Sequence, residues 1–270
     1  MYQSIPPELL HPEIIIPAAT LLGLLLGSFY NVCIYRYITG ESIVFPPSHC
    51  PHCKQRLRFW ELVPVVSYLL LRGQCARCHA PISIRYPLVE LLSGLAAGLL
   101  AWRYGPTLPF LVYLAFTGML IVASGIDLDC FILPDGITLG GTALAAPAAL
   151  FILGMSWTDV LLGAAVGGGT FLAVLLVFKH LRGVDGMGFG DVKLMLMLGA
   201  LCGPLGLPLI TLVAGISALV AFLLVACLMP REAPLRETPI PFGPFLSLGA
   251  FVQILAGPQI LDWWIAFIAG

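Results

Sequence analysis

Residues 206–228 read GLPLITLVAGISALVAFLLVACL and contain no charged side chain. A helix needs about 20 apolar residues to cross the ~30 Å hydrocarbon core of a bilayer, so this stretch predicts a membrane-spanning helix. The composition of the whole chain agrees, since 59% of its 270 residues are hydrophobic, 10% are charged and its mean hydropathy is +0.99. Soluble domains carry about 25% charged residues, so an ordinary soluble enzyme is excluded.

Eight apolar runs, this one included, predict an all-α, polytopic membrane bundle with about eight spans. The runs cover residues 14–34, 87–103, 108–126, 136–154, 158–178, 192–204, 206–228 and 243–267. We predict three parts in the chain: an outward amino terminus with the first span at 1–34, a polar loop domain at 35–86, and a membrane domain at 87–270.

The one long polar stretch, residues 35–86, holds seven of the thirteen Lys and Arg residues. Cytoplasmic loops of membrane proteins are rich in Lys and Arg, so this stretch is predicted to face the cytoplasm. If successive loops lie on alternate sides of the membrane, starting from this cytoplasmic stretch, Arg103 is the one basic residue predicted to lie outside. Residues 1–13 carry no Lys or Arg, so the amino terminus is predicted to face outward, with no cleaved signal peptide.

Four of the eight cysteines form two CxxC pairs in this loop: Cys50, Cys53, Cys75 and Cys78. Two such pairs at this separation are typical of a tetrahedral four-thiolate zinc site. The cytoplasm is reducing, and a loop of about fifty residues has too little core to fold unaided. A closed shell of four thiolates leaves no position for water, so the predicted zinc is structural.

Six acidic residues lie beside predicted spans, where an ionisable group is a functional hypothesis by default. They are Glu90, Asp127, Asp129, Asp135, Asp185 and Asp191. The predicted topology puts segments 127–135 and 185–191 on the cytoplasmic side, at the ends of different helices. Two close aspartates share a proton, so one acts as general base on water and the other as general acid, which is the chemistry of aspartic peptidases.

The residues alone leave the choice of pair open. Asp191 follows Gly188 and Gly190, which let the backbone pass close to an extended substrate, and the start of a helix stabilises its charge. Gly188, Gly190 and Lys193 are therefore candidate substrate-positioning residues, although a helix N-cap role explains Asp191 equally well. Asp127 lies closest to its span, whereas Asp135 is predicted to cap the following helix.

Four blocks of sequence resemble one known family, the bacterial type IV prepilin peptidases, which are leader peptidases and N-methyltransferases. The blocks are GSFYNVCIYR at 27–36, the paired CxxC motifs with LRG at 71–73 and RYPLVE at 85–90, the segment 127–135, and MGFGDVK at 187–193. The last block contains the GxGD element, which also marks presenilin-type intramembrane proteases. Those proteases lack the four-cysteine loop, so the combination is specific.

The resemblance implies that Asp127 and Asp191 are the catalytic pair of an aspartic endopeptidase in the bacterial inner membrane. The predicted parts are then a cytoplasmic four-cysteine zinc-binding domain at 35–86 and a transmembrane aspartic peptidase domain at 87–270. It implies a substrate, the basic leader of a type IV prepilin or type II secretion pseudopilin, cut after a glycine on the cytoplasmic side. It also implies methylation of the new amino terminus, with S-adenosylmethionine as donor. The expected partners are thus pilins and membrane lipid, without nucleic acid. No residue is identified for binding the methyl donor.

Two alternatives remain open. Ile38 and Leu62 stand where the family usually has proline and asparagine, in the half associated with methylation, so one alternative is a peptidase without methyltransferase activity. The other is a non-enzymatic membrane transporter or assembly scaffold, whose acidic residues relay protons and whose zinc loop docks a partner.

Overall fold

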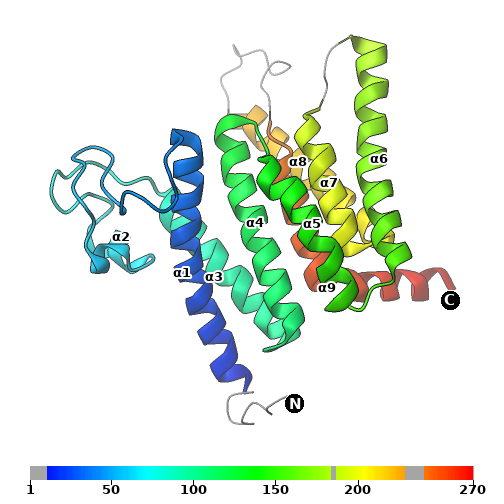
Figure 1. The fold of residues 1–270 in the computed structure, drawn as a ribbon, viewed down its shortest axis with the longest axis horizontal. Coiled ribbons are helices and arrows are strands. Elements are labelled where there is room, and N and C mark those ends of the chain that lie inside the picture. The colour runs from blue at the N-terminus through cyan, green and yellow to red at the C-terminus, as the bar shows by residue number, and fades with distance from the viewer. Residues whose placement is uncertain (1–10, 184–186, 229–239, 270) are drawn as a thin grey trace. The chain divides into compact units, whose positions relative to one another are not determined.

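A computed structural model describes residues 11–183, 187–228 and 240–269 (Figure 1). Helices make up most of these residues, so the predicted all-α class is confirmed. The chain packs as two compact units, residues 1–122 and 123–270. The three-part division predicted from the sequence stays a prediction.

The first unit is built on two helices, α1 (Pro12–Thr39) and α3 (Arg85–Tyr104), which pack along each other. Their backbones approach closely at Gly23 and Gly27 of α1. A Cβ at Gly23 would lie 2.4 Å from the Ser93 carbonyl oxygen, and one at Gly27 would lie 2.8 Å from the Glu90 Cα. Small residues at these positions allow the close contact.

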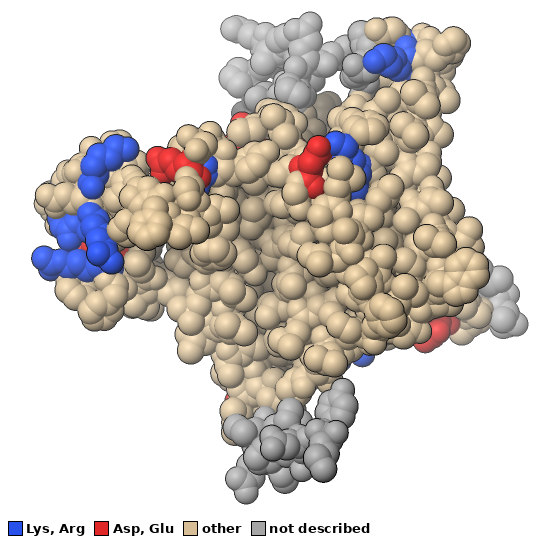
Figure 2. Space-filling model, in the orientation of Figure 1, with Lys and Arg blue, Asp and Glu red and all other residues tan. Residues whose placement is uncertain are grey.

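The loop between α1 and α3 contains two short elements, the 3-10 helix η2 (Phe59–Leu62) and α2 (Val66–Leu70). Lys and Arg side chains gather over this loop on the face drawn in Figure 2, whereas the helical parts of that face show few charges. The first unit ends within α4 (Leu108–Cys130).

The second unit is centred on α7 (Phe189–Cys202), which packs mainly against three other helices. These are α5 (Asp135–Phe151), α6 (Trp157–Arg182) and α9 (Gly243–Ala269). The unit also contains the end of α4, the short η3 (Pro204–Gly206) and α8 (Leu207–Leu228). The side chains of Leu194, Met195, Met197 and Leu198 are fully buried, so α7 is apolar on all sides because it is surrounded by protein.

Five helical stretches in the described part are long and apolar enough to cross a membrane, which confirms the prediction of a multi-pass membrane protein. They are Pro12–Thr39, Leu108–Cys130, Trp157–Arg182, Pro204–Cys227 and Gly243–Phe267. The other three predicted spans form α3, α5 and α7. The lengths of α5 and α7 are 17 and 14 residues, short of the about 20 that a full crossing requires.

Candidate active site and metal centre

Asp127 lies in the last turns of α4 with its side chain only 5% exposed. Its Oδ2 accepts a hydrogen bond of 3.0 Å from the backbone N–H of Gly243, the first residue of α9. The first N–H groups of a helix have no partner within the helix and carry its positive dipole end. The start of α9 therefore stabilises a negative charge on Asp127.

Asp191 lies in the first turn of α7 and is 7% exposed. Gly188 occupies the N-cap position of this helix, so the alternative N-cap role for Asp191 is wrong. Leu133 packs against both Gly190, the neighbour of Asp191, and Gly243, the donor to Asp127, so the two carboxylates lie in the same part of the second unit. Folding thus brings together two buried carboxylates that are 64 positions apart in the sequence. Asp191 lies in the first turn of α7, and Asp127 lies against the first residue of α9.

Two of the three candidate substrate-positioning residues, Gly188 and Gly190, differ in how closely other atoms approach them. A Cβ at Gly190 would lie 3.0 Å from the Cβ of Leu133, so the glycine permits close packing there. A Cβ at Gly188 would make only ordinary contact, 3.7 Å from Asp191 Oδ2.

Lys193, the cation nearest to Asp191 in sequence, pairs with a different aspartate. Its Nζ lies 2.6 Å from Asp135 Oδ1 and 5.1 Å from the centre of the Phe189 ring. Pro134 occupies the N-cap position of α5, so the predicted capping role of Asp135 is wrong. Asp185 lies outside the described residues.

The four loop cysteines form one cluster in the first unit. Their Sγ atoms all lie within 4.8 Å of one another, and the Sγ atoms of Cys50 and Cys78 are 3.8 Å apart. A tetrahedral zinc with bonds of about 2.3 Å places its sulfur ligands about 3.8 Å apart. The cysteines are reduced, and the cluster can therefore hold a metal ion.

The two CxxC segments have the same backbone conformation. In each, the N–H of the first cysteine donates to the carbonyl five residues later, Gln55 or Ala80. In each, the residue after the second cysteine has a positive φ, 57° for Lys54 and 56° for His79, and its N–H donates back to the first cysteine. This repeated turn directs both pairs of thiols to one point.

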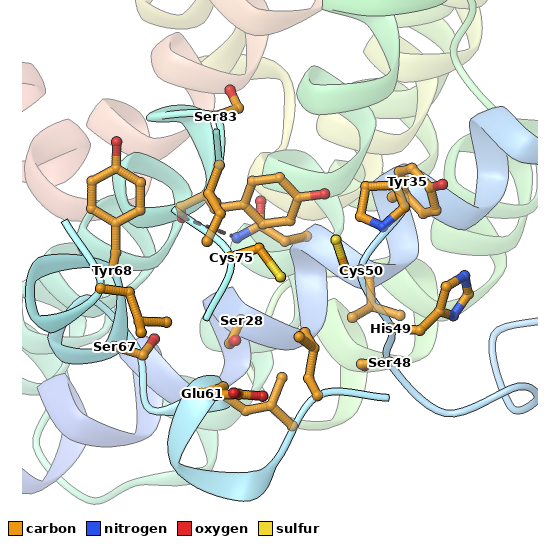
Figure 3. Close-up of a pocket in the computed structure, with 18 of the residues that line it drawn as sticks. Ser28, Tyr35, Ser48, His49, Cys50, Glu61, Ser67, Tyr68, Cys75 and Ser83 are labelled. Carbon is orange, nitrogen blue, oxygen red and sulfur yellow. Dashed lines mark hydrogen bonds between the residues drawn. The ribbon is translucent and has the colours of Figure 1, made fainter. Parts of the chain in front are cut away.

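Backbone N–H groups also prepare one of the four thiols, that of Cys75 (Figure 3), to bind a cation. The N–H groups of Cys78 and Arg77 donate to the Cys75 sulfur and lower the pKa of Cys75 to about 7. Metals bind the thiolate form of cysteine, so a lowered pKa favours metal binding at neutral pH.

Comparison with known proteins covers nearly the whole chain. The family model described as bacterial peptidase A24 N-terminal domain matches residues 21–104, and the one described as type IV leader peptidase family matches residues 114–224. Proteins named prepilin leader peptidase/N-methyltransferase from Stutzerimonas stutzeri and Pseudomonas aeruginosa are each 38% identical to this chain over 95% of its length and 96% of theirs. The chain belongs to the type IV leader peptidase family.

A relative of the same name from Neisseria gonorrhoeae is 37% identical over 93% of this chain and 94% of its own. No solved structure matches the chain. Membership of a leader peptidase family identifies the chain as an enzyme, which decides against the transporter or scaffold alternative.

Gly243 is a residue of this candidate site that the sequence reasoning missed. A Cβ at this position would lie 2.7 Å from Asp127 Oδ2 and 3.0 Å from Leu133 Cδ2, so only glycine lets the carboxylate reach its N–H donor. The sequence does contain one signal for this position. Gly243 precedes Pro244, and proline is favoured in the first turn of a helix. That signal indicates a helix start but not what packs against it.

We therefore expect Gly243→Ala to lower kcat for leader cleavage by about 100-fold, because displacing a catalytic group by about 1 Å has an effect of that order. The measurement is the rate of prepilin cleavage by the purified variant. Gly140→Ala is the matched control, since a Cβ at this α5 position meets nothing within 4 Å. Equal activity of the two variants would contradict the role assigned to the Gly243 contact.

A second contact explains Glu90, the buried carboxylate of α3. Its Oε2 accepts a 2.7 Å hydrogen bond from the backbone N–H of Val65. Val65 has φ 62° and ψ −47°, and the N–H of Val66 donates to the Pro64 carbonyl, which makes Val65 the centre of a strained γ-turn. Glu90 thus holds the strained turn of the loop against α3, which is a structural role.

Proposed function

We propose that this chain is an inner-membrane aspartic endopeptidase that removes the basic leader of type IV prepilins or type II secretion pseudopilins after a glycine. In the same proposal it then methylates the new amino terminus. The observation that carries the proposal is the buried pair Asp127 and Asp191, contributed by separate helices of a chain in the type IV leader peptidase family.

Peptide hydrolysis follows from two carboxylates that share one proton. The ionised carboxylate takes a proton from water, and the water oxygen forms a bond to the carbonyl carbon of the scissile glycine. The protonated carboxylate gives its proton to the leaving nitrogen as the C–N bond breaks. Because both groups are buried, a substrate that enters the site displaces the remaining water and strengthens their electrostatic effect.

The cytoplasmic orientation of the site is supported by the order of the helices. Asp127 lies at the end of α4, whereas Asp191 and Gly243 lie at the starts of α7 and α9. These three helix ends fall on one side of the membrane when successive spans alternate in direction. The excess of Lys and Arg in the loop at 35–86 identifies that side as cytoplasmic.

A structural zinc in the four-cysteine cluster is part of the proposal. Four thiolates complete a tetrahedral shell and leave no position for a reacting water. The Sγ distances and the repeated turns of the two CxxC segments fit this metal. Cys50, Cys53, Cys75 and Cys78 would hold it and so stabilise the loop between α1 and α3.

The methyl transfer is supported by the names of the relatives, and S-adenosylmethionine is the donor we propose. When bound, it supplies a methyl group to the free amine: the N–C bond forms, the C–S bond breaks, S-adenosylhomocysteine leaves and the nitrogen gives a proton to water. For this transfer the chain must also provide a site that binds S-adenosylmethionine.

The test is incubation of the detergent-purified, zinc-loaded protein with a prepilin, with and without S-adenosylmethionine, followed by intact mass measurement. We expect loss of the leader in both samples and a further gain of about 14 Da with the donor. Cleavage without the gain would identify a peptidase that lacks methyl transfer. No cleavage of several prepilins by folded protein would contradict the proposed function.

A further inference from the structure

The side chain of Leu133 lies against the backbone beside both aspartates. At Gly190, the residue before Asp191, an added Cβ would lie 3.0 Å from the Leu133 Cβ. At Gly243, the hydrogen-bond donor to Asp127, an added Cβ would lie 3.0 Å from the Leu133 Cδ2. Non-bonded carbon atoms pack about 3.5–4.0 Å apart. Leu133 therefore occupies the space that a side chain at either glycine needs.

A sharp turn holds Leu133 on its amino-terminal side. Helix α4 ends at Cys130, and Phe131 has a φ of 56°. Bulky residues rarely adopt this left-handed conformation, so the chain reverses direction abruptly there. The N–H of Phe131 donates a 2.9 Å hydrogen bond to the carbonyl of Asp127. The turn is thus fixed to the helix that carries the first aspartate.

Pro134 holds Leu133 on its other side. A proline restricts the residue before it to an extended backbone. The Pro134 carbonyl accepts hydrogen bonds of 3.0 Å from the N–H groups of Ile137 and Thr138, and one of 3.2 Å from the fully buried Thr138 hydroxyl. Leu133 therefore lies in a segment anchored at both ends, and its side chain has little freedom to retreat.

The burial of this segment selects the same residue. Leu133 is 6% exposed, whereas Phe131 and Ile132 before it are 52% and 54% exposed. Leu133 is therefore the residue of this turn that packs into the second unit, and it is as deeply buried as the two aspartates. A side chain held in a closely packed interior excludes any group that overlaps with it.

A substrate brings its own backbone into this space. The carbonyl carbon that water attacks must lie within reach of both carboxylates, since reacting atoms meet at about 3–3.5 Å. The Cα of the residue before the cleaved bond is bonded directly to that carbon. A Cβ on it is therefore surrounded by the atoms that pack around the pair, and Leu133 is the side chain that lies beside both halves of the pair.

We propose that Leu133 determines which residue can precede the cleaved bond, because its side chain fills the space that a Cβ at that substrate position needs. The inference rests on the proposed function, in which the cut follows a glycine, and it names the residue that imposes this requirement. The leucine that leaves room only for glycine at positions 190 and 243 of the enzyme then leaves room only for glycine in the substrate.

The test compares kcat/KM for two prepilins, one with glycine before the cleaved bond and one with alanine, using the full-length protein in detergent. The wild type should prefer glycine by about 10- to 200-fold, the usual discrimination for one carbon atom. We expect Leu133→Ala to lower this preference about 10-fold or more. Leu133→Val removes a single methylene and should lower it less. Cleavage of the glycine prepilin by each variant verifies that the aspartate pair is intact.

Two control variants separate this effect from a general loosening of the packing. Leu201→Ala truncates another buried leucine, about 15 Å along α7 from Asp191. Ile132→Ala changes the exposed neighbour of Leu133 in the same turn. Both should keep the wild-type preference for glycine. A preference that falls as far in Leu201→Ala as in Leu133→Ala would contradict the role of Leu133.

The other contradicting results are equally distinct. An unchanged preference in Leu133→Ala and Leu133→Val, with cleavage of the glycine prepilin retained, would refute the proposal. Loss of all cleavage even in Leu133→Val would show that Leu133 supports the aspartate pair and does not select the substrate. A wild type that cleaves no prepilin would contradict the proposed function itself, which separates that failure from an error about Leu133.

Discussion

Replacing either aspartate of the pair by asparagine is expected to abolish leader cleavage. General acid–base catalysis contributes about 10²- to 10⁴-fold to a rate, so kcat for Asp127→Asn and for Asp191→Asn should each fall by about 10³-fold or more. Asparagine keeps the shape of the side chain but neither accepts a proton from water nor carries one to the leaving nitrogen. Prepilin cleavage by each purified single variant, followed by mass measurement, gives the rate.

The control for this experiment is Asp129→Asn, two residues along α4, where the side chain is exposed. This variant should cleave at close to the wild-type rate. Methylation of a pilin that has already been cleaved should continue in all three variants, because the three aspartates lie in the second unit and the family resemblance associates methylation with the amino-terminal half. Full cleavage by either Asp127→Asn or Asp191→Asn would refute the dyad.

Removal of the metal should have the second large effect. We expect the double variant Cys50→Ala and Cys75→Ala to fall from one zinc per chain to none, because it loses one thiolate from each CxxC pair. Zinc binding contributes about 10–16 kcal/mol in small zinc domains, so the loop at 40–84 should unfold without it. Metal analysis and limited proteolysis of the loop measure the two consequences, and methylation should be lost with them.

Cys227→Ser is the matched control, because this thiol lies exposed in α8 and takes no part in the cluster. It should keep its zinc and its resistance to protease. A wild-type protein that takes up no zinc on reconstitution, or a double variant that retains it, would contradict the metal assignment.

The cysteine cluster illustrates what could be predicted from local sequence. Each CxxC pair forms a turn through hydrogen bonds that span only five residues, so the spacing already specifies its geometry. To form the four-cysteine cluster, the two CxxC pairs then need only to bind one common metal ion. Membrane spans can be predicted from apolar runs in the same local way, because a bilayer imposes one length and one composition on a spanning helix.

The aspartate pair shows where such reasoning stopped. Two aspartates in separate segments were expected from the topology, but only the family resemblance selected Asp127 and Asp191 among six acidic residues. Lys193 lies two positions after Asp191, yet its partner is Asp135 on α5. The length of the lysine side chain reaches a neighbouring helix, so proximity in sequence was a poor guide to the partner.

The sequence by itself determined that this protein is a multi-pass helical membrane protein with a four-cysteine site, because these properties follow from composition and short-range spacing. Only the tertiary structure decided that Gly243 donates to Asp127 and that Glu90 holds the strained turn at Val65. These contacts join residues 25 and 116 positions apart, so they depend on how the packed helices and the loop approach one another.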